Sequence, residues 1–174
     1  EQGKDGLASW AFDEEKHWWH TRYAGDRESG EDNISKTTRP WIGSGFGQEI
    51  RLKKITYTGR TDQPENNHNN IIKYSLYYAD MEEPTATPAS GDWVLAKTGY
   101  FTSAVEAQDI VLEEAVKATH FKLVAENTNN WANNDTAANG YHGAGSNGGG
   151  DTSAENIKVY AEDTLNLTVK APID

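Results

Sequence analysis

The 174-residue chain contains no cysteine and a single methionine. The lack of cysteine excludes thiol catalysis, cysteine-bound zinc, haem attachment through thioethers and iron–sulfur clusters. No apolar run approaches the roughly 20 residues that a membrane-spanning helix needs, and no signal peptide opens the chain at Glu1. We therefore expect a soluble segment, without membrane insertion, that has been excised from a larger protein.

Basic residues are also scarce, because 16 Lys and Arg side chains stand against 27 Asp and Glu side chains, a formal net charge of −11. Such a charge repels phosphate backbones and anionic headgroups, and no run of Lys or Arg opposes it locally. Nucleic acid and acidic membranes are therefore not expected as partners. The length predicts one domain over residues 1–174, large enough to fold without disulfides or a structural metal.

Aromatic residues are plentiful, with six Trp, eight Tyr and four Phe in an otherwise hydrophilic chain. Their flat faces suit sugar rings, although most such side chains serve as bulky core in any globular domain. The hydrophobic pattern predicts strands rather than helices, since apolar residues alternate with period two in several segments and form short dense runs in others. The expected strands are residues 48–59, 70–79, 92–101, 108–113, 117–126, 156–161 and 165–169. Seven or more short strands predict an all-β sandwich.

Three stretches are expected to be loops by their composition: residues 24–40, 61–70 and 127–151. The third is rich in Asn and Gly and contains Trp131, Tyr141 and His142. Loops longer than about 15 residues are usually functional or disordered. We therefore look for a binding site in this loop.

Catalytic chemistry finds little support in the sequence. The acidic residues 13–15 could supply one carboxylate of a glycoside hydrolase, but nothing fixes a second carboxylate as its partner. Ser44 lies between two glycines without the Gly-x-Ser-x-Gly frame of a nucleophile elbow. His17 and His20 stand three residues apart with no further zinc-binding pattern, so a metal, if bound, is expected to be calcium held by oxygens.

Six segments in a fixed order carry a resemblance to a known family. They are Ala11-Phe12-Asp13, Trp19-His20-Thr21, Pro40-Trp41-Ile42, Ile55-Thr56-Tyr57-Thr58-Gly59-Arg60, Ile71-Ile72-Lys73-Tyr74-Ser75-Leu76-Tyr77 and Ser153-Ala154-Glu155-Asn156-Ile157-Lys158-Val159-Tyr160. Together they resemble the discoidin domain, or coagulation factor V/VIII C-type domain. The residues of these segments are most similar to those of its bacterial carbohydrate-binding members of family 32 and relatives such as family 71.

The resemblance implies an eight-stranded jelly-roll β-sandwich, which is galactose-binding-domain-like, with a sugar site on the loops at one end. It also implies a structural Ca²⁺ in the loop after the first aspartate, closed by the glutamate of the late Ala-Glu-x-Ile strand. Those positions are Asp13 and Glu155 in this sequence.

For the sugar site, the resemblance and the chemistry agree. A galactose-like ring needs an aromatic face against its apolar patch and planar donors for neighbouring hydroxyls. The resemblance implies ligand-binding roles for His20, Arg60, Asn67, Asn70, Trp131, Tyr141 and His142. Arg60 could instead form a surface ion pair, and Tyr141 could instead anchor its own loop. Trp131 competes with Tyr141 for the role of the stacking aromatic.

The expected function is that of a non-catalytic carbohydrate-binding module. It would recognise galactose or N-acetylgalactosamine termini of glycans, including N-acetyllactosamine, and would target a parent glycosidase or adhesin to them. It is expected to be monomeric and extracellular or attached to a bacterial cell wall. The alternative is a discoidin-type adhesion domain that binds protein or lipid, and an enzyme is the third possibility. The negative charge and the Asn-, Gly- and His-rich loops argue against lipid.

Overall fold

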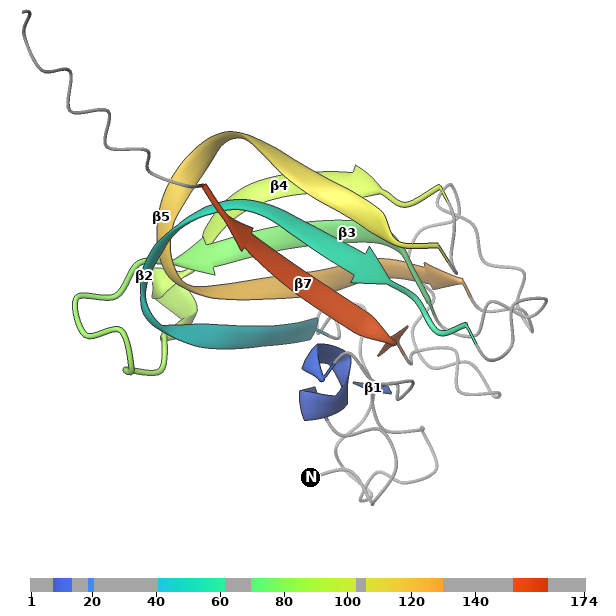
Figure 1. Cartoon of the computed structure of the whole chain (residues 1–174), viewed down its shortest axis with the longest axis horizontal. Helices are drawn as coiled ribbons and strands as arrows, with labels where there is room; N and C mark the ends of the chain where they lie inside the picture. The colour runs from blue at the N-terminus through green and yellow to red at the C-terminus, as the bar shows by residue number, and fades with distance from the viewer. Residues whose placement is uncertain are drawn as a thin grey trace, which may run out of the picture.

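The computed structural model describes residues 8–13, 19–20, 41–61, 70–102, 106–129 and 152–162. Within these ranges, two short 3-10 helices, η1 (Ala8–Phe12) and η3 (Ser90–Asp92), accompany the strands. The strands are β1 (Trp19–His20), β2 (Trp41–Thr58), β3 (Asn70–Ala79), β4 (Val94–Tyr100), β5 (Gln108–Asn129), β6 (Ser153–Ala154) and β7 (Asn156–Ala161). The predicted all-β fold is confirmed, and the described residues contain seven strands where eight were expected (Figure 1). None of the described helices has the length or apolarity to cross a bilayer.

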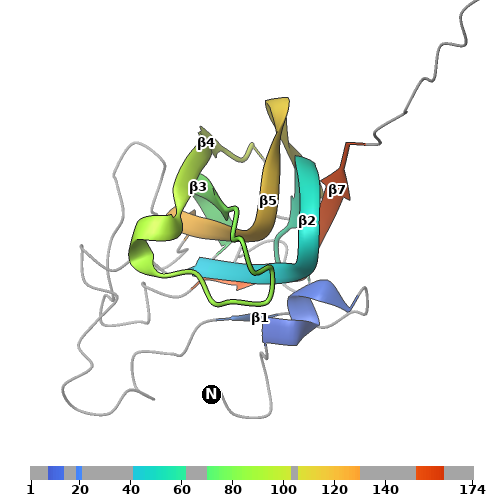
Figure 2. The same ribbon diagram turned by 90° about the vertical axis from the view of Figure 1, so that its left-hand side faces the viewer.

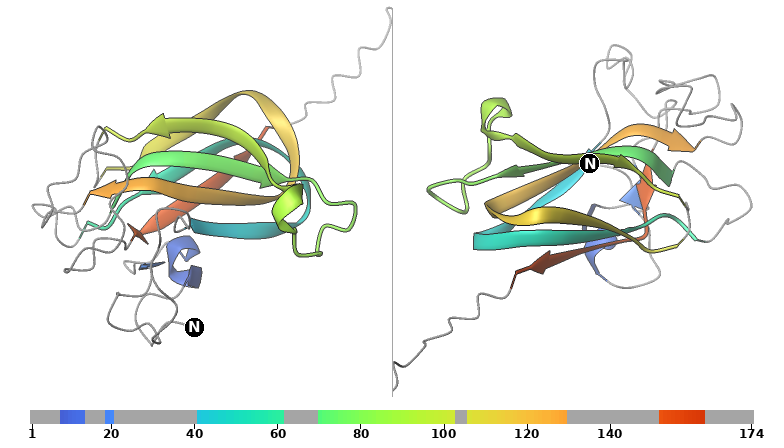
Figure 3. Two further views of the ribbon diagram at one scale, coloured as in Figure 1. Left: turned by 180° about the vertical axis from the view of Figure 1, so that it is seen from behind. Right: turned by 90° about the horizontal axis from the view of Figure 1, so that it is seen from above.

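The strands pair in the order β1-β6-β3-β5-β2-β7, and β4 pairs with β3. All pairings are antiparallel except the contact of β3 with β6. The long strands β2 and β5 pass through both layers of the fold. One layer contains β4, β3, the second half of β5 and the first half of β2, and the other contains the first half of β5, the second half of β2, and β7. Figure 2 and Figure 3 show the two layers enclosing a common interior.

Two opposed bulges bend β2 and β5 from one layer into the other. Between the pairs Gly45↔His120 and Ile50↔Ala118, the four residues 46–49 of β2 face one residue of β5. Between Leu52↔Val116 and Lys54↔Val111, the four residues 112–115 of β5 face one residue of β2. Because a bulge shortens one strand relative to its partner and increases the twist, the pair of bulges turns the ladder around a corner.

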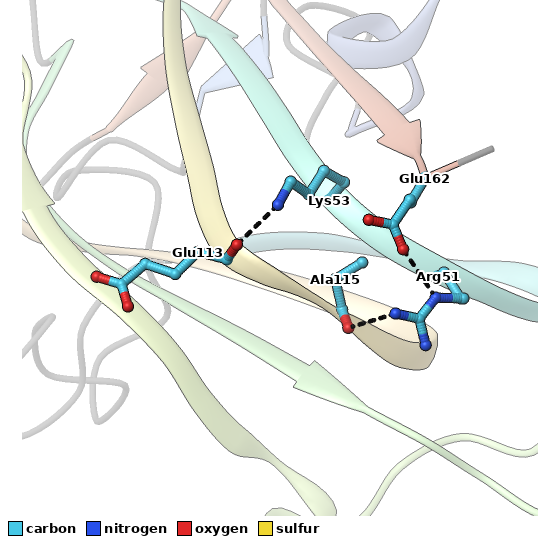
Figure 4. Close-up of polar contacts among 5 residues, drawn as sticks. All are labelled: Arg51, Lys53, Glu113, Ala115 and Glu162. Carbon is cyan, nitrogen blue, oxygen red and sulfur yellow. Dashed lines mark hydrogen bonds and ion pairs between the residues drawn. The ribbon is translucent and has the colours of Figure 1, made fainter. Parts of the chain in front are cut away.

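The β5 bulge is held by two basic side chains from β2 (Figure 4). Arg51 Nη2 donates to the Ala115 carbonyl oxygen at 3.3 Å, and Lys53 Nζ donates to the Glu113 carbonyl oxygen at 2.8 Å. Arg51 Nε also contacts Glu162 Oε2 at 3.0 Å, beyond the end of β7. These side chains satisfy carbonyls that the interrupted ladder leaves without a strand partner.

The β2 bulge is closed by an aromatic contact. The ring of Phe46 stacks on the buried ring of Phe121 with centroids 5.9 Å apart. Gly47 takes a positive φ of 69°, a conformation that costs glycine nothing and other residues more. Side-chain contacts with the paired strand therefore stabilise each bulge, polar contacts at the β5 bulge and an aromatic contact at the β2 bulge.

The core lies between the two layers. The largest fully buried side chains come from both of them and are Tyr57, Phe121, Leu52, Ile55, Ile71, Leu76, Ile110 and Leu123. The predicted alternation over residues 117–126 is confirmed, because Thr119, Phe121, Leu123 and Ala125 are buried. Phe101 packs between Tyr57 and Tyr74, with ring centroids 4.7 and 4.6 Å away.

Several expected strand limits need correction. The strand expected at residues 48–59 begins at Trp41, and the two strands expected at 108–113 and 117–126 form one strand, β5. In both cases a bulge interrupts the alternation without ending the strand. The expected strand 165–169 lies outside the described residues.

Candidate functional site

The two connections that were expected to carry ligand-binding residues start and finish at one end of the sandwich. β2 ends, β3 begins and β5 ends there, on the right of Figure 1. Residues 62–69 connect β2 to β3, and residues 130–151 connect β5 to β6. Asn70, the first residue of β3, is the register partner of Asn129 on one side and of Ser153 on the other. A single residue therefore joins the ends of both connections.

The side chain of Asn70 fixes the main chain of Arg60. Its Oδ1 accepts the Arg60 backbone N–H at 2.7 Å, and its Nδ2 donates to the Arg60 carbonyl oxygen at 3.2 Å. The same Oδ1 accepts the Ser153 hydroxyl at 2.9 Å. Asn70 is fully buried and Arg60 is half-buried. The carboxamide thus holds Arg60 in place at the point where the chain leaves β2.

The buried side chain of Tyr57 in β2 connects β3 and β6 by hydrogen bonds. Its hydroxyl donates to the Ser153 carbonyl oxygen at 2.8 Å and accepts the Ile71 backbone N–H at 2.9 Å. Burial raises the pKa of the Tyr57 phenol far above its usual value, so the group stays a neutral donor. Tyr57, Asn70 and Ser153 therefore form a buried polar network in which each named hydrogen bond joins two strand ends.

Glu155 connects the segment between β6 and β7 to the residue after Arg60. Its Oε2 accepts the Thr61 backbone N–H at 3.0 Å and also the Thr61 hydroxyl. The Glu155 backbone N–H donates to the Thr58 carbonyl oxygen at 2.9 Å. Arg60 and Thr61 are consequently held by two different side chains, one from β3 and one from the β6–β7 junction.

The expected metal residues lie on elements that pack together. Asp13 directly follows η1, Glu155 directly precedes β7, and η1 contacts β7. Next to Glu155, the buried Oδ1 of Asn156 accepts no hydrogen bond from the described residues. The described residues contain no group of three or more His, Asp and Glu side chains that could share an ion. Oxygen donors are nevertheless the type that Ca²⁺ prefers, and main-chain carbonyls can complete its shell.

Apart from Arg60, the expected ligand-binding residues divide into three groups. His20 lies in β1, where its backbone pairs with Ser153, so the topology brings it to the same end as Arg60. Asn70 is there too, but its buried and hydrogen-bonded side chain gives it a supporting position beneath Arg60. The remaining expected residues, Asn67, Trp131, Tyr141 and His142, lie outside the described residues.

Sequence reasoning missed the supporting residues Tyr57, Thr61 and Ser153. In the sequence, Tyr57 looks like one more apolar position of an alternating strand, and hydroxyl residues such as Thr61 and Ser153 are common at strand ends. The only available signal was that Tyr57 and Ser153 lie in segments that carry the family resemblance and that Thr61 directly follows one of them.

Comparisons with known proteins agree on the fold. No protein-family model matches the chain, and no curated protein matches it significantly. Among solved structures, the chain is similar to the family 32 carbohydrate-binding module of Clostridium perfringens NanJ in complex with galactose. The identity is 19%, the TM-score is 0.59, and the match covers 91% of this chain and 87% of that one.

Two further structures extend this likeness. The module CpGH89CBM32-5 from Clostridium perfringens, in complex with GalNAc-β-1,3-galactose, is 24% identical with a TM-score of 0.59, and the match covers 91% of this chain and 86% of that one. An F5/8 type C domain from Bacteroides fragilis is 14% identical with a TM-score of 0.57, covering 89% and 80% of the two chains. The chain therefore has the β-sandwich fold of family 32 modules and F5/8 type C domains, as the resemblance predicted.

Proposed function

We propose that the chain is a non-catalytic carbohydrate-binding module that recognises galactose or N-acetylgalactosamine termini of glycans. Its sugar site would lie at the end of the sandwich where Arg60 leaves β2. In this role the module would target a parent glycosidase or adhesin to its glycan, outside the cell or at a cell wall.

The observation that carries the proposal is the fixed position of Arg60. The carboxamide of Asn70 brackets its main chain, and both connections with the expected ligand residues end beside it. A guanidinium can donate to two adjacent hydroxyls, so a fixed arginine at a loop end suits a sugar with neighbouring hydroxyl groups. Two structures of the same fold hold galactose or a GalNAc-galactose disaccharide, which supports the choice of sugar.

The proposal is tested by titrating the purified chain with galactose, N-acetyllactosamine and glucose in a calorimeter. We expect a dissociation constant on the order of 0.1–1 mM for the first two sugars, because an exposed loop site buries little area. Glucose should bind much more weakly. The same chain should release no product from a chromogenic galactoside. Equal binding of glucose would contradict the galactose specificity, and measurable product release would contradict the non-catalytic role.

We also propose that Asp13 and Glu155 help to hold a structural Ca²⁺. The packing of η1 on β7 and the unsatisfied Oδ1 of Asn156 support an oxygen-lined cation site at this junction. Bound Ca²⁺ would stabilise the loop end by joining the segment after η1 to the β6–β7 junction.

Removal of calcium should lower the melting temperature, since a ligand that binds only the folded state stabilises it by mass action. The measurement is thermal unfolding with and without a chelator, together with elemental analysis. The chelator effect should disappear in Glu155→Gln and persist in Glu162→Gln, whose carboxylate pairs with Arg51 instead. The calcium site would be refuted if the chelator left the melting temperature unchanged and elemental analysis found no metal in the protein.

A further inference from the structure

Three aromatic rings from three parts of the fold surround one lysine on the outer face of the sheet. The Nζ of Lys122 lies 4.5 Å from the ring centroid of Trp93, 5.2 Å from that of Tyr77 and 5.6 Å from that of Trp41. Lys122 lies in β5, between the buried residues Phe121 and Leu123, so its side chain points away from the core. We call Trp41, Tyr77, Trp93 and Lys122 the aromatic–lysine cluster.

The cluster is accessible and lies away from the loop end. Trp41 is 54% exposed, and the other three side chains are half-buried. Tyr77 stands seven residues along β3 from Asn70, a distance of about 23 Å at 3.3 Å per residue. Gly43, the register partner of Lys122, keeps the strands close here, because a Cβ on it would come within 2.3 Å of the Phe121 carbonyl oxygen.

The ammonium group of Lys122 differs from most others in the fold. Four lysines each donate to a carbonyl or carboxylate oxygen: Lys53, Lys54, Lys97 and Lys117. Within the part of the chain that the structure describes, Lys122 Nζ has no hydrogen bond or ion pair and lies over three aromatic rings. Burial against them lowers the pKa of Lys122, which reflects partial loss of water. Its N–H donors therefore remain available to an incoming oxygen acceptor.

This combination matches one class of ligand. The exposed ring of Trp41 offers a flat surface for the apolar face of a pyranose, and a partly desolvated ammonium bonds most strongly to a carboxylate. A cationic ligand is disfavoured, because the ammonium group of Lys122 already occupies the faces of the aromatic rings. An acidic polymer would be repelled by the net charge of −11. A ligand with a single carboxylate is attracted by the Lys122 ammonium and suffers less of this repulsion.

We propose that the aromatic–lysine cluster is a second sugar-binding site and that it takes a terminal sugar carrying one carboxylate, such as a uronic acid. This site goes beyond the galactose site proposed at the loop end and does not depend on it. Trp41 would stack on the ring, and Lys122 would bond the carboxylate.

The test uses methyl β-glucuronide and methyl β-glucoside, which differ only in the carboxylate at C6. NMR titration of the labelled chain should show amide shifts at Trp41, Tyr77, Trp93 and Lys122 with the glucuronide. Because a hydrogen bond to a charged group contributes about 1.5–3 kcal/mol, the glucuronide should bind at least about tenfold more tightly than the glucoside. Equal binding of the two sugars, or binding of neither, would overturn the proposal.

Variants separate this site from the loop end. Lys122→Met should weaken glucuronide binding at least about tenfold, while Lys122→Arg should retain most of it. Trp41→Ala, at an exposed position, should also lose binding without a change in melting temperature. Lys73→Met removes an equal charge beside Tyr100, on the same sheet, and should have no effect.

Lys122→Met should bind galactose with the same dissociation constant as the wild type, because Lys122 lies outside the loop-end site. Failure of the wild-type chain to bind galactose would contradict only the site proposed at the loop end. Unchanged glucuronide binding in a folded Lys122→Met variant, or shifts confined to Arg60 and its neighbours, would refute the second site.

Discussion

Replacement of Arg60 by alanine is expected to abolish detectable galactose binding and to leave the domain folded. Loss of charge-assisted bonds to two hydroxyls removes roughly 1.5–3 kcal/mol from a total of about 4–5.5 kcal/mol, which pushes the dissociation constant beyond easy measurement. The fold survives because Asn70 bonds the backbone N–H and carbonyl of residue 60, and both are retained in Arg60→Ala.

Calorimetric titration and thermal unfolding check the two halves of this prediction. Arg51→Ala provides the matched control: it removes an arginine from β2, the strand that precedes Arg60, and this arginine bonds Glu162 and the Ala115 carbonyl at the corner instead of the loop end. We expect Arg51→Ala to bind galactose as the wild type does. Full galactose affinity in Arg60→Ala would show that Arg60 is not part of the sugar site. It would favour the alternative that Arg60 forms a surface ion pair.

The second large effect is expected in Asn70→Ala, which should lose both stability and galactose affinity. The substitution leaves the Ser153 hydroxyl without its acceptor at a buried position and the Arg60 backbone N–H without its acceptor at a half-buried one. At about 1–3 kcal/mol for the buried group and about 1 kcal/mol for the half-buried one, we expect a loss of roughly 2–4 kcal/mol in the free energy of unfolding. Affinity should fall because Arg60 is no longer fixed.

Urea denaturation measures the first effect and titration with galactose the second. Ser153→Ala removes only the hydroxyl that bonds Asn70, so it should cost about 1 kcal/mol and keep galactose binding. A stable Asn70→Ala variant that fails to bind galactose would show that Asn70 contacts the sugar directly, as the family resemblance implied, and would contradict the supporting role that its burial indicates.

The sequence predicted the limits of those strands that are short, apolar and clearly bounded. β3 and β7 have the expected limits, residues 70–79 and 156–161, because each is a short run rich in β-branched and aromatic residues that polar residues bound on both sides. The pattern could not show that β5 continues through Glu113 and Glu114. That continuity depends on Arg51 and Lys53, which come from β2 and bond carbonyls of the bulge.

The start of β2 was missed for a related reason. Gly43 and Gly45 favour a loop when only the neighbouring sequence is considered. In the fold, the packing of β5 against β2 requires glycine at these positions. A Cβ on Gly45 would lie 2.6 Å from the His120 ring, so the neighbouring strand can approach only a bare backbone. Contacts between segments that are 75 residues apart in the chain leave no trace in the local pattern of β2.

For the candidate site, the sequence predicted the importance of Arg60 and Asn70 through the resemblance but could not assign their separate roles. Both side chains are polar and lie at the ends of apolar strands, Arg60 after β2 and Asn70 at the start of β3. Only the fold shows that Asn70 is enclosed by Tyr57, Ser153 and the Arg60 backbone. The aromatic–lysine cluster was out of reach for the same reason, since its four members come from four separate segments.

The role of Asn70 as a common end point has a consequence for protein engineering. Residues 62–69 and 130–151 are inserted between positions that hydrogen bonds and strand pairing already fix. The entropic cost of closing a loop rises only slowly with its length, so either connection should accept replacement sequences of other lengths. The framework of Tyr57, Asn70 and Ser153 therefore offers a graft site, into which two foreign loops could be placed side by side to create new binding specificities.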